Sequence, residues 1–495
     1  MAECRRHGTI WLSCVVVPRA ARHEDLGRDR MRVVIVGGGF AGCAAAMQAA
    51  RMGAEVVLAE RTDMLCGTGA VGGIMRNNGR YTAAEEMIVM GAGELFRLID
   101  MCCRHKNVDF PGHSHASLFD VALVPAKVEE TLNELGVDIR FMSRIIQVHH
   151  LWKDPVSGKY RLFSVKDHQG KIIEGDVFID TTGTAGPQGM CHKYGNGCVS
   201  CILRCPAFGG RVSLSALCKV KEYGAVSVRN DVPGTLDRVF GNGFDKAADV
   251  YGSGLALGAM SGSCKLMKGS LSPQLCSLLE KKGVAVIPVP KNLRSVHLDI
   301  KACQQYALPE FAENIILLDT GHAKLMAPYF PLQTLKKIPG FENVRFEDPY
   351  AGGVGNSIRF TACVPRDDTM LVSGMENLFC AGEKSGIFVG HTEAIVTGTL
   401  AGYNAVRREQ NKPLLSLPKE TACGDAISWV GEQMNSKEGR GFKYTFSGSV
   451  LFERMKEKGF YTTDTAAIRE RVRQAGMENI FAIQSNTPKV YGESS

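Results

Sequence analysis

Glycines at fixed spacing give the first sign of chemistry in this chain of 495 residues. The pattern Gly37-x-Gly39-x-x-Gly42 follows an apolar, β-branched run and precedes an alanine-rich stretch. In such a turn the first glycine permits the tight bend, the second admits a pyrophosphate, and the third lets helix and strand pack closely. The N–H groups of Phe40 and Ala41 would then face the phosphates at the start of the helix. The order strand, glycine turn, helix predicts a dinucleotide site.

An acidic residue after the second predicted strand narrows the choice of dinucleotide. Glu55–Ala59 reads as that strand, and Glu60 lies 18 residues after Gly42. A carboxylate there accepts hydrogen bonds from ribose hydroxyls and repels a 2′-phosphate, so NADP is disfavoured at this site. Arg61 follows directly and is grouped with the cofactor-binding residues.

Two later segments favour FAD over NAD. Val177–Asp180 reads as a buried strand leading to a glycine turn at Gly183, a segment with which flavoproteins commonly return to the adenine side. Asn377–Cys380 reads as a second strand that ends near an acid, which usually holds the ribityl chain. The helix predicted from Thr392 to Arg407 would place its positive N-terminus near the isoalloxazine ring. The expected FAD-binding residues are therefore Gly37, Gly39, Phe40, Ala41, Gly42, Glu60, Arg61, Gly73, Gly183, Gly382, Glu383 and Glu393.

A glycine-dense loop, Leu65–Gly73, carries the first candidate catalytic residue. Its N–H groups could hydrogen-bond the ring, and Cys66 could act as a nucleophile or as a flavin adduct partner. Packing beneath the ring explains Cys66 equally well, and both readings stay open. His391 is a candidate proton donor, or else a helix cap. Arg76, Asn77, Asn78 and Arg80 follow the loop and are candidate binders of an anion or a substrate.

Closely spaced cysteines form a second candidate centre. The spacing Cys198-x2-Cys201-x3-Cys205-Pro resembles the last part of a ferredoxin run, and Cys191 or Cys218 could supply a fourth thiolate. Zinc, with Cys191 or the histidine after it, is an alternative. A redox-active C-x-x-C pair is another, and a loop that binds nothing is the last.

The composition is that of an ordinary globular protein, with 45% hydrophobic and 22% charged residues. The net charge of +7 permits an anionic ligand or RNA without arguing for either. No apolar run approaches the ~20 residues that cross a bilayer. The 17 cysteines are scattered and odd in number, which indicates reduced thiols and a cytoplasmic location.

The elements that must position these residues predict an α/β fold. We expect an interrupted Rossmann-type FAD-binding domain over 31–190 and 346–410, with the cysteine-rich segment at 191–218. A mixed α+β substrate domain would be inserted at 219–345, and 411–495 would be a small C-terminal extension. Residues 1–30 read as a disordered leader or as a start codon chosen upstream of Met31, in preference to an export signal.

The substrate domain shows three predicted strands, Val284–Val289, Ser295–Ile300 and Ile315–Leu318. Its chemically interesting residues are His297, His322 and Lys324, each of which is more simply read as structural.

Several segments carry a family resemblance. Gly37–Gly53, Cys66–Ile74, Leu335–Glu342 and Leu378–Asn404 resemble the tRNA uridine-modifying flavoproteins of the glucose-inhibited-division A family and their folate-dependent tRNA methyltransferase relatives. The resemblance implies FAD and a cysteine-containing loop beside the flavin. About ninety residues follow Arg408, too few for that family's long helical tRNA-binding domain.

These features predict an FAD-dependent oxidoreductase that acts on a small molecule through the flavin N5, with coupling to an iron–sulfur cluster as an open reading and NAD(P)H as a candidate electron donor. The alternative is flavin- and folate-dependent tRNA uridine modification. A third interpretation is a non-catalytic subunit that passes electrons to a redox partner protein.

Overall fold

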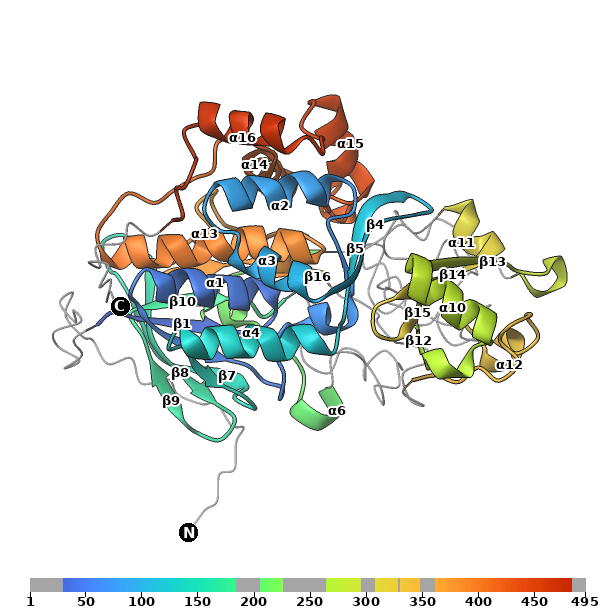
Figure 1. Ribbon diagram of the computed structural model, residues 1–495. Coiled ribbons are helices and arrows are strands. Elements are labelled where there is room, and N and C mark those ends of the chain that lie inside the picture. Colours follow the sequence, from blue (N-terminus) through green and yellow to red (C-terminus); the bar gives the residue numbers. More distant parts are fainter. Residues whose placement is uncertain are drawn as a thin grey trace, which may run out of the picture.

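A five-stranded parallel sheet forms the centre of the protein (Figure 1). The computed structural model describes residues 30–183, 205–225, 264–294, 308–327, 330–347 and 361–482, so nearly all of the predicted leader lies outside the described residues. The strand order is β17-β10-β1-β2-β6, and every neighbouring pair is parallel. The strands are β1 (Arg32–Val36), β2 (Glu55–Ala59), β6 (Asp138–Arg140), β10 (Val177–Asp180) and β17 (Leu378–Cys380). The predicted Rossmann-type fold is confirmed.

Helices α1 (Phe40–Arg51) and α13 (His391–Glu409) pack on one face of this sheet, with α4 (Leu123–Glu134) beside them. The α1–α13 crossing is close because both helices present small residues. A Cβ built on Gly398 or on Gly402 would overlap the carbonyl oxygen of Ala41 or of Ala45, respectively. Backbones approach this closely only where the side chain is absent.

An antiparallel meander covers the opposite face of the sheet. It consists of β7 (Ile145–Lys153), β8 (Tyr160–Asp167) and β9 (Ile172–Glu174). Its buried residues share one hydrophobic cluster with the alternate side chains of the central strands, such as Val34 and Phe178. The period-2 alternation of a strand therefore divides the Rossmann core between two layers.

A small antiparallel sheet, in the order β3-β5-β4, joins the FAD-binding part to the inserted part. It contains β3 (Ile74–Met75), β4 (Cys103–Phe110) and β5 (His113–Phe119). Helices α2 (Gly79–Val89) and α3 (Glu94–Met101) lie between β3 and β4 in the chain.

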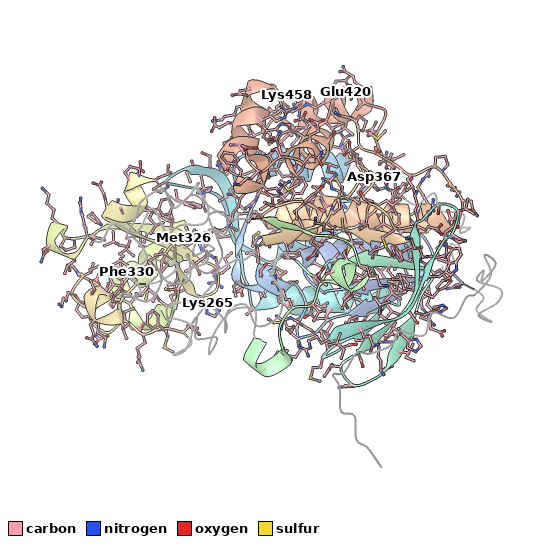
Figure 2. All side chains as sticks on the ribbon, turned by 180° about the vertical axis from the view of Figure 1, so that it is seen from behind. Lys265, Met326, Phe330, Asp367, Glu420 and Lys458 are labelled. Carbon is pink, nitrogen blue, oxygen red and sulfur yellow. The ribbon has the colours of Figure 1, made fainter. Side chains whose placement is uncertain are left out.

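The inserted part builds a separate four-stranded antiparallel sheet with its own core, in the order β12-β15-β14-β13. Two of its predicted strands are present, while Ser295–Ile300 and His297 lie outside the described residues. Figure 2 shows Lys265, Met326 and Phe330 on this body, apart from Asp367, Glu420 and Lys458. Its elements are β12 (Cys264–Leu266), α10 (Pro273–Lys282), β13 (Val284–Pro288), α11 (Pro309–Glu313), β14 (Asn314–Asp319), β15 (Ala323–Leu325) and α12 (Leu332–Leu335).

The C-terminal helices pack over α2 and share the core of α1 and α13. They are α14 (Ala422–Gln433), α15 (Ser449–Glu457) and α16 (Thr465–Gln474). The remaining elements are short: α6 (Cys205–Phe208), α7 (Leu214–Leu217), and the paired strands β11 (Tyr223–Ala225) and β16 (Thr361–Cys363). Within the described ranges, no helix is long and apolar enough to span a membrane.

Candidate functional site

The glycine turn between β1 and α1 has the geometry that a pyrophosphate site requires. A Cβ on Gly37, where φ is +109°, would lie 2.5 Å from the carbonyl oxygen of Thr181, and one on Gly42 would overlap the Gly37 carbonyl. Beside Gly39 nothing lies within 4 Å of the same position. A side chain at Gly37 or at Gly42 would overlap the backbone, so packing requires glycine at these two positions. Gly39 instead has open space beside it. Gly39 is also the N-cap of α1, so Phe40 and Ala41 lie in the first turn, whose N–H groups could bind phosphate.

Glu60 lies beside this turn and is held there by hydrogen bonds. Its Oε2 accepts from the Gly38 N–H at 2.7 Å, and its Oε1 accepts from the N–H and hydroxyl of Thr62 at 2.8 and 2.9 Å. A carboxylate has about four acceptor positions, so the group retains capacity for a ribose hydroxyl. The neighbouring Arg61 donates to the Gly209 carbonyl at 2.6 Å.

The β17–α13 connection meets the start of α1. The Gly382 N–H donates to the Thr397 hydroxyl at 2.8 Å, and a Cβ on Gly382 would lie 3.0 Å from the Cβ of Ala41. Glu383 follows in the same short 3₁₀ turn. Gly183, with φ +74°, ends the described part of the β10 connection. These turns follow the carboxyl ends of adjacent parallel strands, where α/β folds bind ligands, and the open space at Gly39 fits FAD.

We call residues 66–73 the flavin loop, because the sequence predicts that they lie beside the isoalloxazine ring of FAD. The Cys66 N–H donates to the Gly38 carbonyl at 2.7 Å, which fixes the loop against the glycine turn. The Cys66 thiol is buried, and burial raises its pKa well above the usual range. Reactive cysteines are exposed thiolates, so this environment is that of a packed thiol, and a nucleophilic role would require the loop to open.

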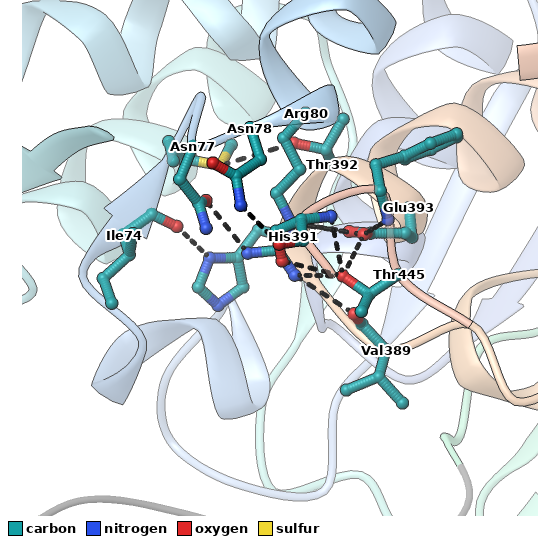
Figure 3. Close-up of polar contacts among 12 residues, drawn as sticks. Ile74, Asn77, Asn78, Arg80, Val389, His391, Thr392, Glu393 and Thr445 are labelled. Atoms are coloured by element: carbon teal, nitrogen blue, oxygen red, sulfur yellow. Dashed lines mark hydrogen bonds and ion pairs between the residues drawn. The ribbon is translucent and has the colours of Figure 1, made fainter. Parts of the chain in front are cut away.

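His391 begins α13 and lies between the flavin loop and two aromatic rings. Its Nδ1 is 3.1 Å from the Ile74 carbonyl oxygen, which can only accept, so Nδ1 carries the proton (Figure 3). The imidazole packs against Phe40 and Phe119, with ring centroids 5.3 and 5.7 Å away. A Cβ on Gly72 would overlap this imidazole. The structure thus brings the candidate proton donor to the flavin loop.

Glu393 forms a buried ion pair that the sequence did not reveal. The Arg80 Nε lies 3.1 and 3.2 Å from its two carboxylate oxygens (Figure 3). The Thr445 hydroxyl and the Phe446 N–H donate to the same carboxylate at 2.7 and 2.8 Å. This geometry makes Glu393 an anchor for the start of α13. Arg80 lies 313 positions away in the chain, so no local pattern could have predicted the pair.

The other candidate anion binders also make internal contacts. Arg76 binds Asp100 through Nη2 at 2.7 Å and Glu85 through Nη1 at 2.5 Å. The side-chain N–H groups of Asn78 donate to two backbone carbonyls. The Asn77 amide donates to Nδ1 of His113 at 2.9 Å, and burial lowers the pKa of His113 to about 3. These side chains donate hydrogen bonds to partners within the protein, and their role as anion or substrate binders stays a prediction.

The inserted part contributes a lysine to the flavin loop. Lys324 donates from Nζ to the carbonyls of Val71 and Gly72, and burial together with nearby Lys265 lowers its pKa to about 7. His322 lies two residues before Lys324 in the chain and pairs with Glu347, with Nδ1 and Oε1 3.5 Å apart. Of these candidates, Lys324 is the one that hydrogen-bonds the loop within the described residues.

The cysteine-rich centre stays a prediction. Cys191, Cys198 and Cys201 lie outside the described residues, and Cys205 begins α6. Among the residues that the structure describes, no group of three or more His, Cys, Asp or Glu side chains could hold a metal ion.

Comparisons with known proteins match both halves of this site. The family described as FAD dependent oxidoreductase matches residues 32–186, and the family glucose inhibited division protein A matches residues 320–413. The tRNA uridine 5-carboxymethylaminomethyl modification enzyme of Synechocystis is 29% identical over 150 residues, which are 30% of this chain and 23% of that enzyme. The methylenetetrahydrofolate–tRNA-(uracil-5-)-methyltransferase of Desulfotalea psychrophila is 38% identical over 95 residues, 19% and 20% of the two chains.

Solved structures show the same fold. Aquifex aeolicus GidA, in its form II crystal, has a TM-score of 0.58 at 16% identity, covering 91% of this chain and 74% of that one. The form I crystal of the same protein gives 0.52. The matched segments span about a fifth to a quarter of the length of the curated relatives.

Proposed function

Because its cofactor-binding parts belong to the FAD flavoproteins of the glucose-inhibited-division A type, we propose that this FAD-dependent enzyme modifies a uridine in tRNA. One observation carries the proposal. The curated relatives that match are named for two different uridine modifications, one carboxymethylaminomethyl and one methyl, and both act on tRNA. The two family matches, at residues 32–186 and 320–413, cover the turns of the candidate FAD site, so we infer a common use of the cofactor.

The residues of this chain would hold FAD in three places. FAD supplies two-electron redox chemistry when bound. The turn around Gly39 and the start of α1 would bind the pyrophosphate, and Glu60 would accept from a ribose hydroxyl. The absence of a side chain at Gly382 would admit the cofactor between α1 and α13. The N-terminus of α13, beginning at His391, would favour negative charge on the reduced ring.

Charge on the inserted part is compatible with an RNA substrate. Residues 264–294 carry six Lys or Arg side chains against one Glu. A local excess of positive charge attracts a phosphate backbone and accelerates its association. We therefore propose that this part contacts the RNA.

The test uses purified protein and a tRNA transcript without modified nucleosides. With methylenetetrahydrofolate and NAD(P)H we expect a 5-substituted uridine, detected by mass analysis of the digested tRNA. The Gly39→Val variant, which blocks the open space at the glycine turn, should give none. An FAD-loaded parent that leaves every uridine unchanged would refute the proposal.

Oxidation or reduction of a small molecule is the second candidate. The match of residues 32–186 to FAD dependent oxidoreductase favours it, since that description names redox chemistry without RNA. NAD(P)H-dependent bleaching of the flavin in RNA-free protein, with no change in added tRNA, would support this candidate over the first. A cytoplasmic location suits both, and ten cysteines whose side chains the structure describes are free thiols, which supports it.

A further inference from the structure

The turn between β14 and β15 brings the inserted part against the flavin loop. The Val121 N–H donates to the Thr320 carbonyl at 3.2 Å, at the start of this turn. Gly73 has φ +75°, and a Cβ there would overlap the Thr320 methyl. On the other side of the loop, a Cβ on Gly72 would overlap the His391 imidazole. The flavin loop is therefore held between the inserted part and the start of α13.

Lys324 reaches the loop from β15. Its Nζ lies 2.9 Å from the Val71 carbonyl oxygen and 2.7 Å from that of Gly72. The side chain is only 7% exposed, so water competes little for these bonds. Below its pKa of about 7 the Lys324 amine is an ammonium group, and hydrogen bonds from a charged donor are stronger than neutral ones. Two consecutive peptide groups of the loop are thus oriented by one residue of the inserted part.

The direction of these carbonyls fixes the direction of the loop's N–H groups. A trans peptide is planar, with its C=O and N–H pointing opposite ways. The peptide between Gly72 and Gly73 has its carbonyl on Lys324. Its N–H, which belongs to Gly73, therefore points away from the Lys324 ammonium.

We propose that Lys324 is a positioning residue for FAD: through the Val71 and Gly72 carbonyls it sets how the flavin loop presents the Gly73 N–H, and it adds a positive charge behind the loop. The inference rests on the FAD site of the proposed function and is independent of the tRNA substrate. It gives the inserted part a direct influence on the cofactor.

The test replaces Lys324 with methionine, which keeps the length of the side chain and removes both donors and charge. Lys265→Met is the matched control. Lys265 on β12 lies opposite Lys324 on β15 in the strand register, so this substitution removes the same charge from a neighbouring position. Reconstitution of apoprotein with FAD should show about tenfold weaker binding in Lys324→Met, the factor that corresponds to about 1.4 kcal/mol. At pH 6, where Lys324 with its pKa of about 7 is mostly charged, the two-electron midpoint potential of Lys324→Met should be more negative than that of the parent, because a lost cation disfavours the anionic reduced flavin. Amides of the flavin loop should exchange faster with deuterium.

Lys265→Met should retain the affinity and loop exchange of the parent. Parent-like affinity, potential and loop exchange in a folded Lys324→Met protein would overturn the proposal. If Lys324→Met does not fold, Lys324→Gln replaces it in the test, because glutamine keeps an N–H donor without the charge. A midpoint potential in Lys324→Gln equal to that of the parent would then overturn the proposal. If the parent binds no FAD, both this inference and the proposed FAD site are refuted. If Lys324→Met shows the expected effects but the parent leaves tRNA unmodified, only the uridine proposal is refuted.

Discussion

Replacing Glu393 with glutamine removes the negative charge from a buried ion pair. The Glu393 side chain is 0% exposed, and that of Arg80 is 6% exposed. In the variant Arg80 keeps neutral acceptors: the Val389 carbonyl at 3.1 Å, the Thr445 hydroxyl at 3.0 Å and the Asn77 amide oxygen at 3.2 Å. Removing one partner of a buried pair costs about 3–5 kcal/mol of unfolding free energy. Because those neutral acceptors remain, we expect a loss near the lower end, about 3 kcal/mol.

A double-mutant cycle measures this loss. Urea unfolding of apoprotein, followed by circular dichroism, would compare Glu393→Gln, Arg80→Met and the double variant. The loss of unfolding free energy in the double variant should be smaller than the sum of the two single losses, by about 2 kcal/mol or more. Bound FAD should also decrease, since the pair anchors the start of α13.

A matched control uses the exposed pair of Lys127 and Glu130, whose Nζ and Oε2 lie 2.7 Å apart. Glu130→Gln should leave unfolding almost unchanged, because exposed pairs contribute little. Single losses at Arg80 and Glu393 below about 1 kcal/mol that simply add would refute the reasoning.

Three further predictions concern the cofactor, pH and the cysteine segment. Gly39→Val should fold yet lose FAD, whereas Gly42→Val should fail to fold, because only the second Cβ would overlap backbone; equal FAD content in parent and Gly39→Val would show that the site is misplaced. Burial lowers the pKa of His113 to about 3 in the folded protein, whereas an unfolded chain has a histidine pKa of about 6.5. Between pH 3 and pH 6.5, therefore, His113 is protonated in the unfolded chain but not in the folded protein. Stability should therefore fall by up to about 1.4 kcal/mol per pH unit as pH drops below 6.5, and His113→Gln should flatten that slope in acid titrations. Cys201→Ser should abolish iron in anaerobically purified protein while FAD remains, and iron analysis that finds no metal in the parent would leave the loop without a cluster.

Local signals explain which parts of the fold could be predicted. The turn Gly37–Gly42, the strand before it and the helix after it follow from residues adjacent in the chain. The helix predicted over Thr392–Arg407 is α13, because its periodic apolar pattern has no breaker. The neighbouring strands β10 and β17 were predicted from short buried runs that end at glycine turns.

Contacts between distant segments explain what the sequence missed. The small sheet β3-β5-β4 has irregular pairing, with register shifts that erase a clean alternation of polar and apolar residues. Arg76 was read from its residue type as an anion binder, but Asp100 and Glu85 accept its hydrogen bonds. Lys324 was more simply read as structural, and its contact with residues some 250 positions earlier has no sequence signature.

The distribution of the family matches indicates where substrate choice lies. Residues 32–186 and 320–413 contain the turns around Gly39, Glu60 and Gly382, whose backbone geometry any FAD-binding relative must reproduce. The inserted part up to β14 lies between the two matches and carries the excess of positive charge. FAD binding constrains the backbone geometry of glycine turns, whereas the surface residues of an inserted domain can differ with the ligand. Lys324 belongs to the inserted part and also lies within the second family match. We therefore expect the surface of the insert to determine the substrate, and Lys324 to influence the flavin that acts on that substrate.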